Sequence, residues 1–153
     1  MWWDKIVKAI CAIGGAIAGL FGEWNGMLTL LAIMMLADYI SGLLAAVVGR
    51  SDKTENGRIS SAAGFIGLAK KGLIMLIVLV ATLLDKTMGN TTMVFQTAVT
   101  CYYIANEGIS IMENADKLGV PYPKKLKEAF ESMRKNNDKD SDKKDDTGQE
   151  GVE

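Results

Sequence analysis

The stretch MLTLLAIMMLADYISGLLAAVV, residues Met27–Val48, decides the fold class of this chain. It is 22 residues long and carries one charge, on Asp38. As an α-helix it would extend about 33 Å, which is enough to cross a hydrocarbon core of about 30 Å. An apolar run of this length with so few charges is typical of a helix that spans a membrane.

Three further apolar segments flank this stretch along the chain. Thr91–Met112 has the same length and one charge, Glu107, although it contains more polar residues. Ala9–Gly22 and Gly72–Leu84 are uncharged runs of 14 and 13 residues, a length at which a buried core helix competes with a membrane helix. We therefore expect an all-α integral membrane protein with about four transmembrane helices. The first of them either spans the membrane or lies in its interface as an amphipathic helix.

The distribution of basic residues favours four spans over three. Four spans place both termini and the loop after Val48 on one side of the membrane, together with nearly all of the lysines and arginines. The turns on the other side contain a single basic residue, Lys86. The positive-inside rule then predicts a multi-pass protein of the bacterial cytoplasmic membrane with both termini in the cytoplasm. The alternative is a signal peptide that is cleaved after Ala18, but its removal would place the basic loop on the wrong side.

The C-terminal part of the sequence changes character after Pro121 and Pro123. The segment PKKLKEAFESMRK predicts a short amphipathic helix with Leu126, Phe130 and Met133 on one side. This helix either lies on the membrane surface or caps the domain. Residues 135–153 are almost wholly polar and bury too little surface to offset chain entropy, so they predict a disordered tail. We expect a membrane domain over residues 1–134 and a charged cytoplasmic tail over 135–153.

The composition excludes several function classes. The net charge is −1, and no basic patch interleaved with aromatic residues indicates a nucleic-acid partner. The chain has no histidine, and its two cysteines are isolated in apolar runs, so no metal or cofactor site is expected. Neither a G-x-S-x-G nor a phosphate-binding GxxxxGK[ST] motif is present. The sequence thus predicts no catalytic residues and no enzyme.

Asp38, Asn106 and Glu107 are the informative polar residues within the predicted spans. A carboxylate at the centre of a span costs roughly 2.5–3.5 kcal/mol, so it should face another helix or a water-filled cavity. One hypothesis makes Asp38 a lumen-facing or switch residue. The other is purely structural, with Asp38 in an interhelical hydrogen bond to a serine, a threonine or an asparagine such as Asn106.

Small residues recur at the spacing that allows close helix packing in membranes. Gly15 and Gly19 form a GxxxG motif in the first apolar segment. A longer series of small residues lies in the second segment and comprises Ala37, Ser41, Gly42, Ala45 and Gly49. These residues could pack helices within one chain or between copies of the chain, and the sequence leaves both options open.

Three stretches together resemble a known family. They are LADYISGLLAAVVGR (Leu36–Arg50), TENGRISSAAGFIGLAKKGLIMLIVLVATLLDK (Thr54–Lys86) and YIANEGISIMENADKLGVPYPKKLK (Tyr103–Lys127). They are similar to the phage lysis and toxin-secretion holins, a group that includes clostridial toxin-release proteins. The matching positions, besides Asp38, Gly42, Asn106 and Glu107, are Ser60, Ser61, Gly64, Gly67, Lys70, Lys71, Glu113, Asn114, Gly119, Pro121 and Pro123. The chain departs from the pattern at Ala62 and Ile66, where relatives often carry basic residues.

The resemblance implies a function that residue spacing alone does not. Such holins accumulate in the lipid bilayer as homo-oligomers and form lesions that depolarise the cell. The lesions release a cell-wall-degrading endolysin or a large toxin, without a need for direct contact with it. Two other hypotheses follow from the residues: a small ion channel or transporter subunit in which Asp38 lines a narrow pathway, and a soluble or peripheral helical interaction protein.

Overall fold

The computed structural model describes residues 1–22 and 24–145, and this part of the chain forms helices and no strands. The helices are α1 (Trp2–Leu20), α2 (Gly26–Val47), α3 (Ser61–Thr87), α4 (Val94–Leu118) and α5 (Lys124–Asp145). The expected all-α class is therefore confirmed. Asn25 begins α2, because its side chain accepts a hydrogen bond from the Leu28 backbone N–H at 2.9 Å.

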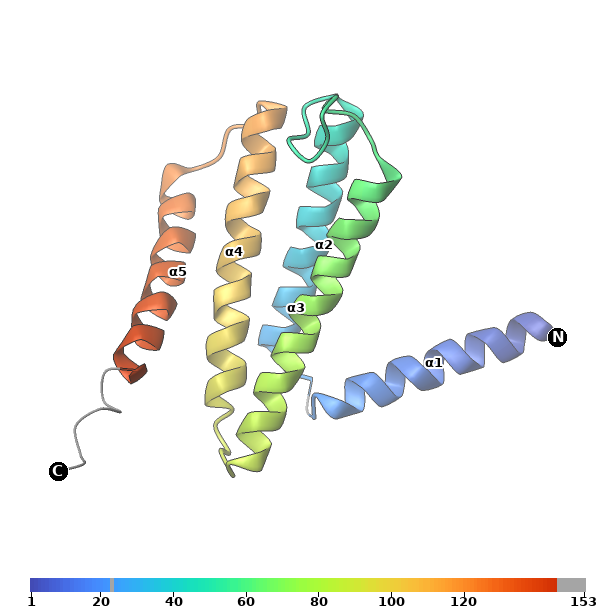
Figure 1. Cartoon of the computed structure of the whole chain (residues 1–153), viewed down its shortest axis with the longest axis vertical. Coiled ribbons are helices and arrows are strands. Elements are labelled where there is room, and N and C mark those ends of the chain that lie inside the picture. Colours follow the sequence, from blue (N-terminus) through green and yellow to red (C-terminus); the bar gives the residue numbers. More distant parts are fainter. Residues whose placement is uncertain (23, 146–153) are drawn as a thin grey trace.

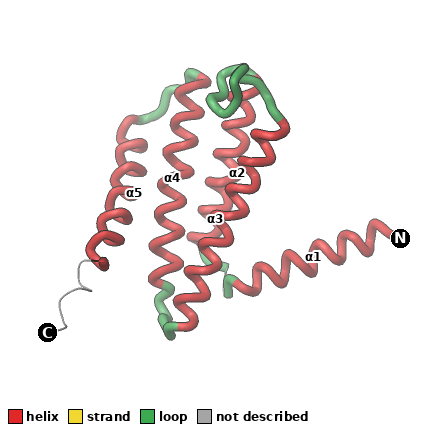
Figure 2. The backbone as a smooth tube through the Cα atoms, viewed as in Figure 1, coloured by secondary structure: helices red, strands yellow, loops and turns green. Residues whose placement is uncertain are grey.

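Helices α2 to α5 stand side by side and alternate in direction along the chain, whereas α1 projects away across their axes (Figure 1). A long loop, residues 48–60, joins α2 to α3 at one end of the bundle, and a short turn joins α3 to α4 at the other (Figure 2). We refer to these as the loop end and the turn end. Helix α4 is central, because it packs against α2, α3 and α5.

The core is a seam between α2, α3 and α4. On α2 the buried residues Leu28, Leu31, Met35, Asp38 and Ala45 lie three, four or seven positions apart, which is the spacing of one helix face. They meet residues of the other two helices, including Val78 and Ile104. The same face of α2 therefore contains apolar residues toward the turn end and a carboxylate toward the loop end.

The outer faces of α2 and α3 are apolar and exposed. Both helices are long and apolar enough to cross a membrane, at about 33 and 40 Å. The exposed large side chains on them are Leu30, Ile33, Leu36, Ile40, Leu43, Leu44, Val47, Phe65, Ile66, Leu68, Leu73, Leu76, Ile77, Val80, Leu83 and Leu84. A soluble monomer rarely exposes so extensive an apolar surface, so these faces support a membrane protein and argue against the soluble alternative.

Helices α1 and α4 differ from simple membrane spans. Although α4 occupies the expected segment, it buries Gln96, Thr100, Glu107 and Asn114 and is too polar to face lipid on all sides. Every α1 side chain that the structure describes is exposed. The structure thus provides two apolar helices that could span, and the count of four spans stays a prediction.

Helix α5 is longer than expected and packs against the rest of the bundle. It packs along α4 rather than standing apart as a short surface helix, and it continues to Asp145 (Figure 1). Nothing in the sequence breaks it earlier, because residues 124–145 contain neither glycine nor proline. Residues 135–145 of the predicted tail are therefore helical. Residues 146–153 lie outside the described residues.

Candidate functional site: a polar cluster inside the helical bundle

Three charged side chains from three helices meet inside the bundle. The Lys71 ammonium on α3 forms an ion pair with Asp38 on α2 at 2.8 Å and another with Glu107 on α4. The exposed fractions of these side chains are 12%, 8% and 5% for Lys71, Asp38 and Glu107. The two acids that the sequence singled out are thus brought together, and Lys71, one of the family-motif positions, joins them.

Asn114 extends this cluster toward the loop end. Its Nδ2 group donates to Asp38 Oδ1 at 3.1 Å and to Ser41 Oγ at 2.9 Å. The interhelical amide partner of Asp38 is therefore Asn114. An asparagine is thus the partner, as one of the two hypotheses expected, but it is not Asn106, which lies on α4 two turns earlier and lines the adjacent cavity. We call Asp38, Lys71, Glu107, Asn114 and Ser41 the polar cluster.

The charges of the polar cluster do not balance. Two carboxylates share one ammonium, and the Asp38 carboxylate also accepts from the Asn114 amide. Removing such charges from water costs several kcal/mol per ion, and their mutual attraction repays this only when the geometry is good. The cluster therefore adds little net stability, but it strongly disfavours any arrangement that separates Lys71 from both acids.

A second buried acid, Asp85 on α3, lies at the turn end. Its carboxylate accepts hydrogen bonds from the backbone N–H groups of Phe95 and Gln96 at 3.1 and 2.8 Å, and from the Asn90 side chain. The residue at the usual capping position of α4, Met93, has a left-handed backbone with φ of 48° and provides no side-chain cap. Asp85 thus caps α4 from the preceding helix.

Gln96, whose backbone N–H Asp85 binds, also connects α4 to α3 and α2 through its side chain. Its amide donates to Thr82 Oγ1 of α3 at 2.7 Å, and its carbonyl accepts from Asn25, the capping residue of α2, at 3.1 Å. Neither Asp85 nor Thr82 was predicted as a site residue from the sequence, and Gln96 had no predicted role. The signal that could have identified Asp85 is an acid at the end of an apolar run, directly before a turn into a helix that has no cap of its own.

The remaining motif residues lie at helix ends, within α3 and in the link to α5. Ser60 caps α3 by accepting from Ala63 N–H at 3.4 Å. Gly64 and Gly67 face Tyr39 of α2, and a Cβ at Gly64 would lie 3.5 Å from its hydroxyl, at ordinary contact distance. Gly119 ends α4 in the left-handed conformation that favours glycine, with φ of 73°. Of the other motif positions, Ser61 begins α3, Lys70 and Glu113 are exposed, and Pro121 and Pro123 lie in the link to α5.

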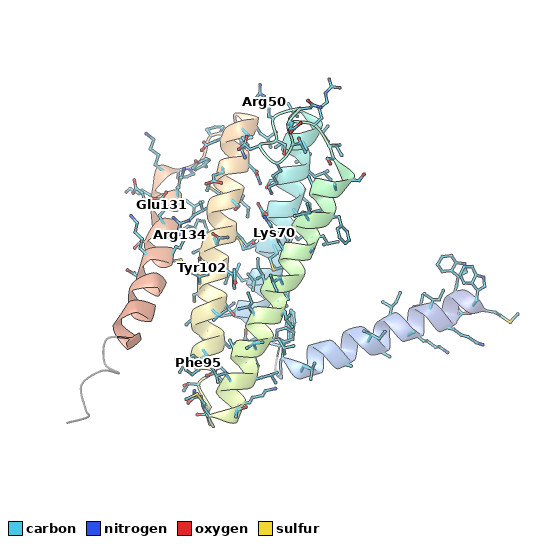
Figure 3. The ribbon with its side chains drawn as sticks, viewed as in Figure 1. Arg50, Lys70, Phe95, Tyr102, Glu131 and Arg134 are labelled. Atoms are coloured by element: carbon cyan, nitrogen blue, oxygen red, sulfur yellow. The ribbon has the colours of Figure 1, made fainter. Side chains whose placement is uncertain are left out.

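The long loop is fixed to the end of α4. Arg50 donates to the carbonyl of Lys117 at 2.9 Å, and the Lys117 ammonium pairs with Asp52 at 2.6 Å. Figure 3 labels Arg50 at this loop end and Phe95 at the opposite turn end of the bundle. A cation at a helix C-terminus also interacts favourably with the helix dipole. The loop therefore lies as a defined layer over the polar cluster.

The small residues fall into two groups. In α2, Ala45 is buried, Ser41 bonds to Asn114, and a Cβ at Gly42 would lie 3.6 Å from the Asn114 amide, so this part of the series packs within the chain. In α1, nothing lies within 4 Å of a Cβ placed at Gly15 or Gly19. Packing of the GxxxG motif against a second copy stays a prediction.

Comparison with known proteins identifies relatives over most of the chain. The model of the bacteriophage holin family matches residues 15–135. An uncharacterized 14.9 kDa protein of Clostridium perfringens is 38% identical over 130 residues, which cover 85% of this chain and 93% of that protein. An uncharacterized protein of Listeria monocytogenes is 43% identical over 116 residues, covering 74% and 76%. No solved structure matches the chain.

A phage protein is among these relatives. The probable holin of Bacillus phage phi105 is 32% identical over 131 residues, covering 85% of this chain and 90% of that protein. The segment that the family model matches, residues 15–135, includes α2, α3 and α4, together with every residue of the polar cluster. The resemblance seen in the sequence is therefore confirmed, and the chain belongs to the bacteriophage holin family.

Proposed function

We propose that the protein is a holin that assembles as a homo-oligomer in the bacterial cytoplasmic membrane. Its lesions depolarise the cell and release a cell-wall-degrading endolysin or a large toxin. The observation that carries this proposal is the polar cluster, because it places Asp38, Lys71 and Glu107 inside a bundle whose outer faces are apolar. Such a chain can insert as a closed unit and still hold the polar groups that a water-filled hole requires.

The cluster gives the closed unit a barrier to opening. Each of the three helices contributes one charge, so no helix can move away without leaving an unpaired charge in a medium of low dielectric constant. If several copies associate and water enters between the helices, the same charges become hydrated and line the hole. The expected behaviour is an abrupt transition rather than gradual leakage.

Helix α5 indicates which side of α4 faces water. Its exposed side chains include Lys124, Lys125 and Glu128, which cannot contact acyl chains without a large energetic cost. Figure 3 shows Arg134 of α5 and Tyr102 of α4 in the space between the two helices. The side of α4 that carries α5 is therefore directed toward water or toward other copies, and α2 and α3 are directed toward lipid.

The proposed topology rests on the distribution of basic residues and not on the packing of α5. The loop end, with Arg50, Lys53 and Arg58, faces the cytoplasm together with both termini, and the chain crosses the membrane about four times. In the structure α5 runs from the loop end back along α4 toward the turn end, and this arrangement does not itself support a cytoplasmic C-terminus (Figure 1). The protein acts without catalysis and without necessary contact with the endolysin. A narrow channel lined by Asp38 is less favoured, because this carboxylate is bound by Lys71 and Asn114 rather than free to bind a passing ion.

Co-expression with a cytoplasmic endolysin in a bacterial host tests the proposal. The expected result is a sudden loss of turbidity together with leakage of a large cytosolic enzyme. Expression of either protein alone is the control. Ion flux without loss of the enzyme would instead support the ion-channel hypothesis, and release of the chain from membranes by carbonate would contradict membrane insertion.

A further inference from the structure

A cavity of about 530 Å³ lies between α2 and α3 at the loop end and is not explained by the polar cluster alone. Its floor contains Asp38, Lys71 and Glu107, and its roof is formed by the long loop. Gly42 of α2 lines it, and a Cβ placed there would lie 3.7 Å from the Lys53 ammonium, at ordinary van der Waals contact. The cavity is thus a space between the polar cluster and the long loop.

The rim of the cavity is basic. Lys53, Arg58 and Lys70 line it in addition to Lys71. Among the side chains that the structure describes, which exclude those of residues 17, 23 and 137–153, these three form no ion pair or hydrogen bond, although Lys53 interacts with the Glu107 charge at longer range. Four cations and two acids line the cavity, so its lining carries excess positive charge. Because Lys71 is already paired, the cations that remain for a ligand are those at the rim.

The walls of the cavity are apolar and continue onto the lipid-facing surface. Leu43 of α2 and Ile66 of α3 line the cavity, and both are also about half exposed on the outer faces of their helices. A ligand here would therefore meet cations at one end and apolar side chains at the other. Inorganic phosphate would contact only the cations at the rim, whereas a phospholipid would contact both these cations and the apolar walls.

The position of Lys70 supports a ligand at membrane depth. It is exposed on a helix that is apolar on both sides of the Lys70–Lys71 pair, and its ammonium must extend toward water or a phosphate to avoid hydrocarbon. Basic pockets between membrane helices bind the headgroups of anionic lipids for this reason.

We propose that this cavity binds one anionic phospholipid, whose phosphate contacts Lys53 and Arg58 and whose acyl chain lies along Leu43 and Ile66. The bound lipid would fill the gap between α2 and α3 and hold the loop closed over the polar cluster. The inference rests on the membrane location proposed above. It concerns a ligand, however, and does not require that the protein form holes.

Isothermal titration calorimetry on the full chain in non-ionic detergent micelles tests the site. The probes are short-chain phosphatidylglycerol, short-chain phosphatidylcholine and inorganic phosphate. We expect saturable binding of phosphatidylglycerol alone. The double variant Lys53→Gln/Arg58→Gln should weaken it about thirtyfold, or about fivefold for each cation lost. The control Lys124→Gln/Lys125→Gln makes the same charge change at the start of α5, outside the cavity, and should leave binding within a factor of about two.

Several results would overturn the proposal. Equal weakening by both double variants would indicate general attraction to a basic surface. If inorganic phosphate bound as tightly as phosphatidylglycerol, the cavity would be a phosphate site and not a lipid site. If phosphatidylcholine bound as tightly as phosphatidylglycerol, the net charge of the headgroup would have no role in binding. Dye release from vesicles, measured in parallel, separates the two proposals, because holes that form normally alongside absent lipid binding would refute only the lipid site.

Discussion

Lys71 holds a central position among individual residues because it is the only cation between two buried acids in the polar cluster. Removing one acid leaves a neutral Lys–carboxylate pair. Removing the lysine leaves two carboxylates in a medium of low dielectric constant, where both desolvation and mutual repulsion act. The three residues should therefore differ strongly in their sensitivity to substitution.

Lys71→Met should destabilise the purified protein by about 3–5 kcal/mol, the usual cost of removing one partner of a buried pair. Asp38→Asn should cost about 1 kcal/mol, since the amide oxygen still accepts from Asn114 and Lys71 keeps Glu107. Chemical unfolding in mixed micelles measures both values. Equal stability of Lys71→Met and Asp38→Asn would contradict the charge argument.

Asp38→Asn should also change the time of lysis at equal expression while leaving membrane insertion intact. The substitution removes the net negative charge from the cluster and lowers the barrier to separating the helices. Turbidity traces and membrane fractionation measure the two effects. Unchanged timing would show that Asp38 has only a structural role.

At the residue scale the sequence predicted the special residues but not all of their partners. Asp38 and Glu107 were identifiable because a charge within a long apolar run is costly. Lys71 was identifiable only as a charge near a span, because its partners lie 33 and 36 positions away in the sequence. Choosing Asn114 over Asn106 requires the rotation of α4 about its axis, which only the packing of α2, α3 and α5 determines.

Among the helices, α4 is capped and covered by side chains of its neighbours. It is capped from α3 by Asp85 and covered by α5, and both contacts lie outside its own sequence. The sequence predicted the helix correctly from its apolar length. It could not predict the capping, because the acid belongs to a different helix.

Asp85→Ala should destabilise the protein by about 2 kcal/mol or more. Loss of a helix cap costs about 0.5–2 kcal/mol, and each buried donor left without a partner adds about 1–3 kcal/mol. The stability of Asp85→Asn should lie between those of the wild type and Asp85→Ala, since the single amide oxygen of asparagine can accept from one of the two N–H groups. Thermal unfolding followed by circular dichroism measures the order. Glu55→Ala in the exposed loop is the control, and a similar loss there would argue against a specific cap.

The contact between α4 and α5 depends on Gly108. A Cβ at this position would lie 2.8 Å from the Phe130 ring, so Gly108→Ala should displace α5. Trypsin should then cleave faster among the lysines of α5, and Phe130→Ala in the same chain should remove the clash. Gly72→Ala, where nothing lies within 4 Å, is the control. Unchanged cleavage in Gly108→Ala would show that α5 does not pack on this surface in the membrane.

Of the apolar residues expected to define one side of α5, only Phe130 makes this close contact. Leu126 and Met133 remain exposed. The amphipathic pattern predicted the helix, but the packing depends on a glycine in another helix.

On the scale of the whole molecule, α1 is the helix with the least packing against the rest of the chain. Its described side chains are exposed, and nothing lies within 4 Å of a Cβ placed at Gly15 or Gly19. Close approach of backbones drives helix association in membranes, so we expect this GxxxG surface to meet a second copy.

Gly15→Leu should therefore reduce the oligomers captured by chemical cross-linking in membranes. Gly14→Leu, an equally open position outside the motif, is the matched control and should have little effect. If both variants form oligomers as the wild type does, α1 is not the contact between copies.

The central claim is that the closed helical bundle opens into holes large enough for a folded protein. Vesicles loaded with both a small dye and a folded enzyme test it most directly, with the purified chain added at increasing ratios to lipid. Dye and enzyme should leave the vesicles together, above a threshold protein-to-lipid ratio. Release of the dye with full retention of the enzyme at every ratio would contradict it.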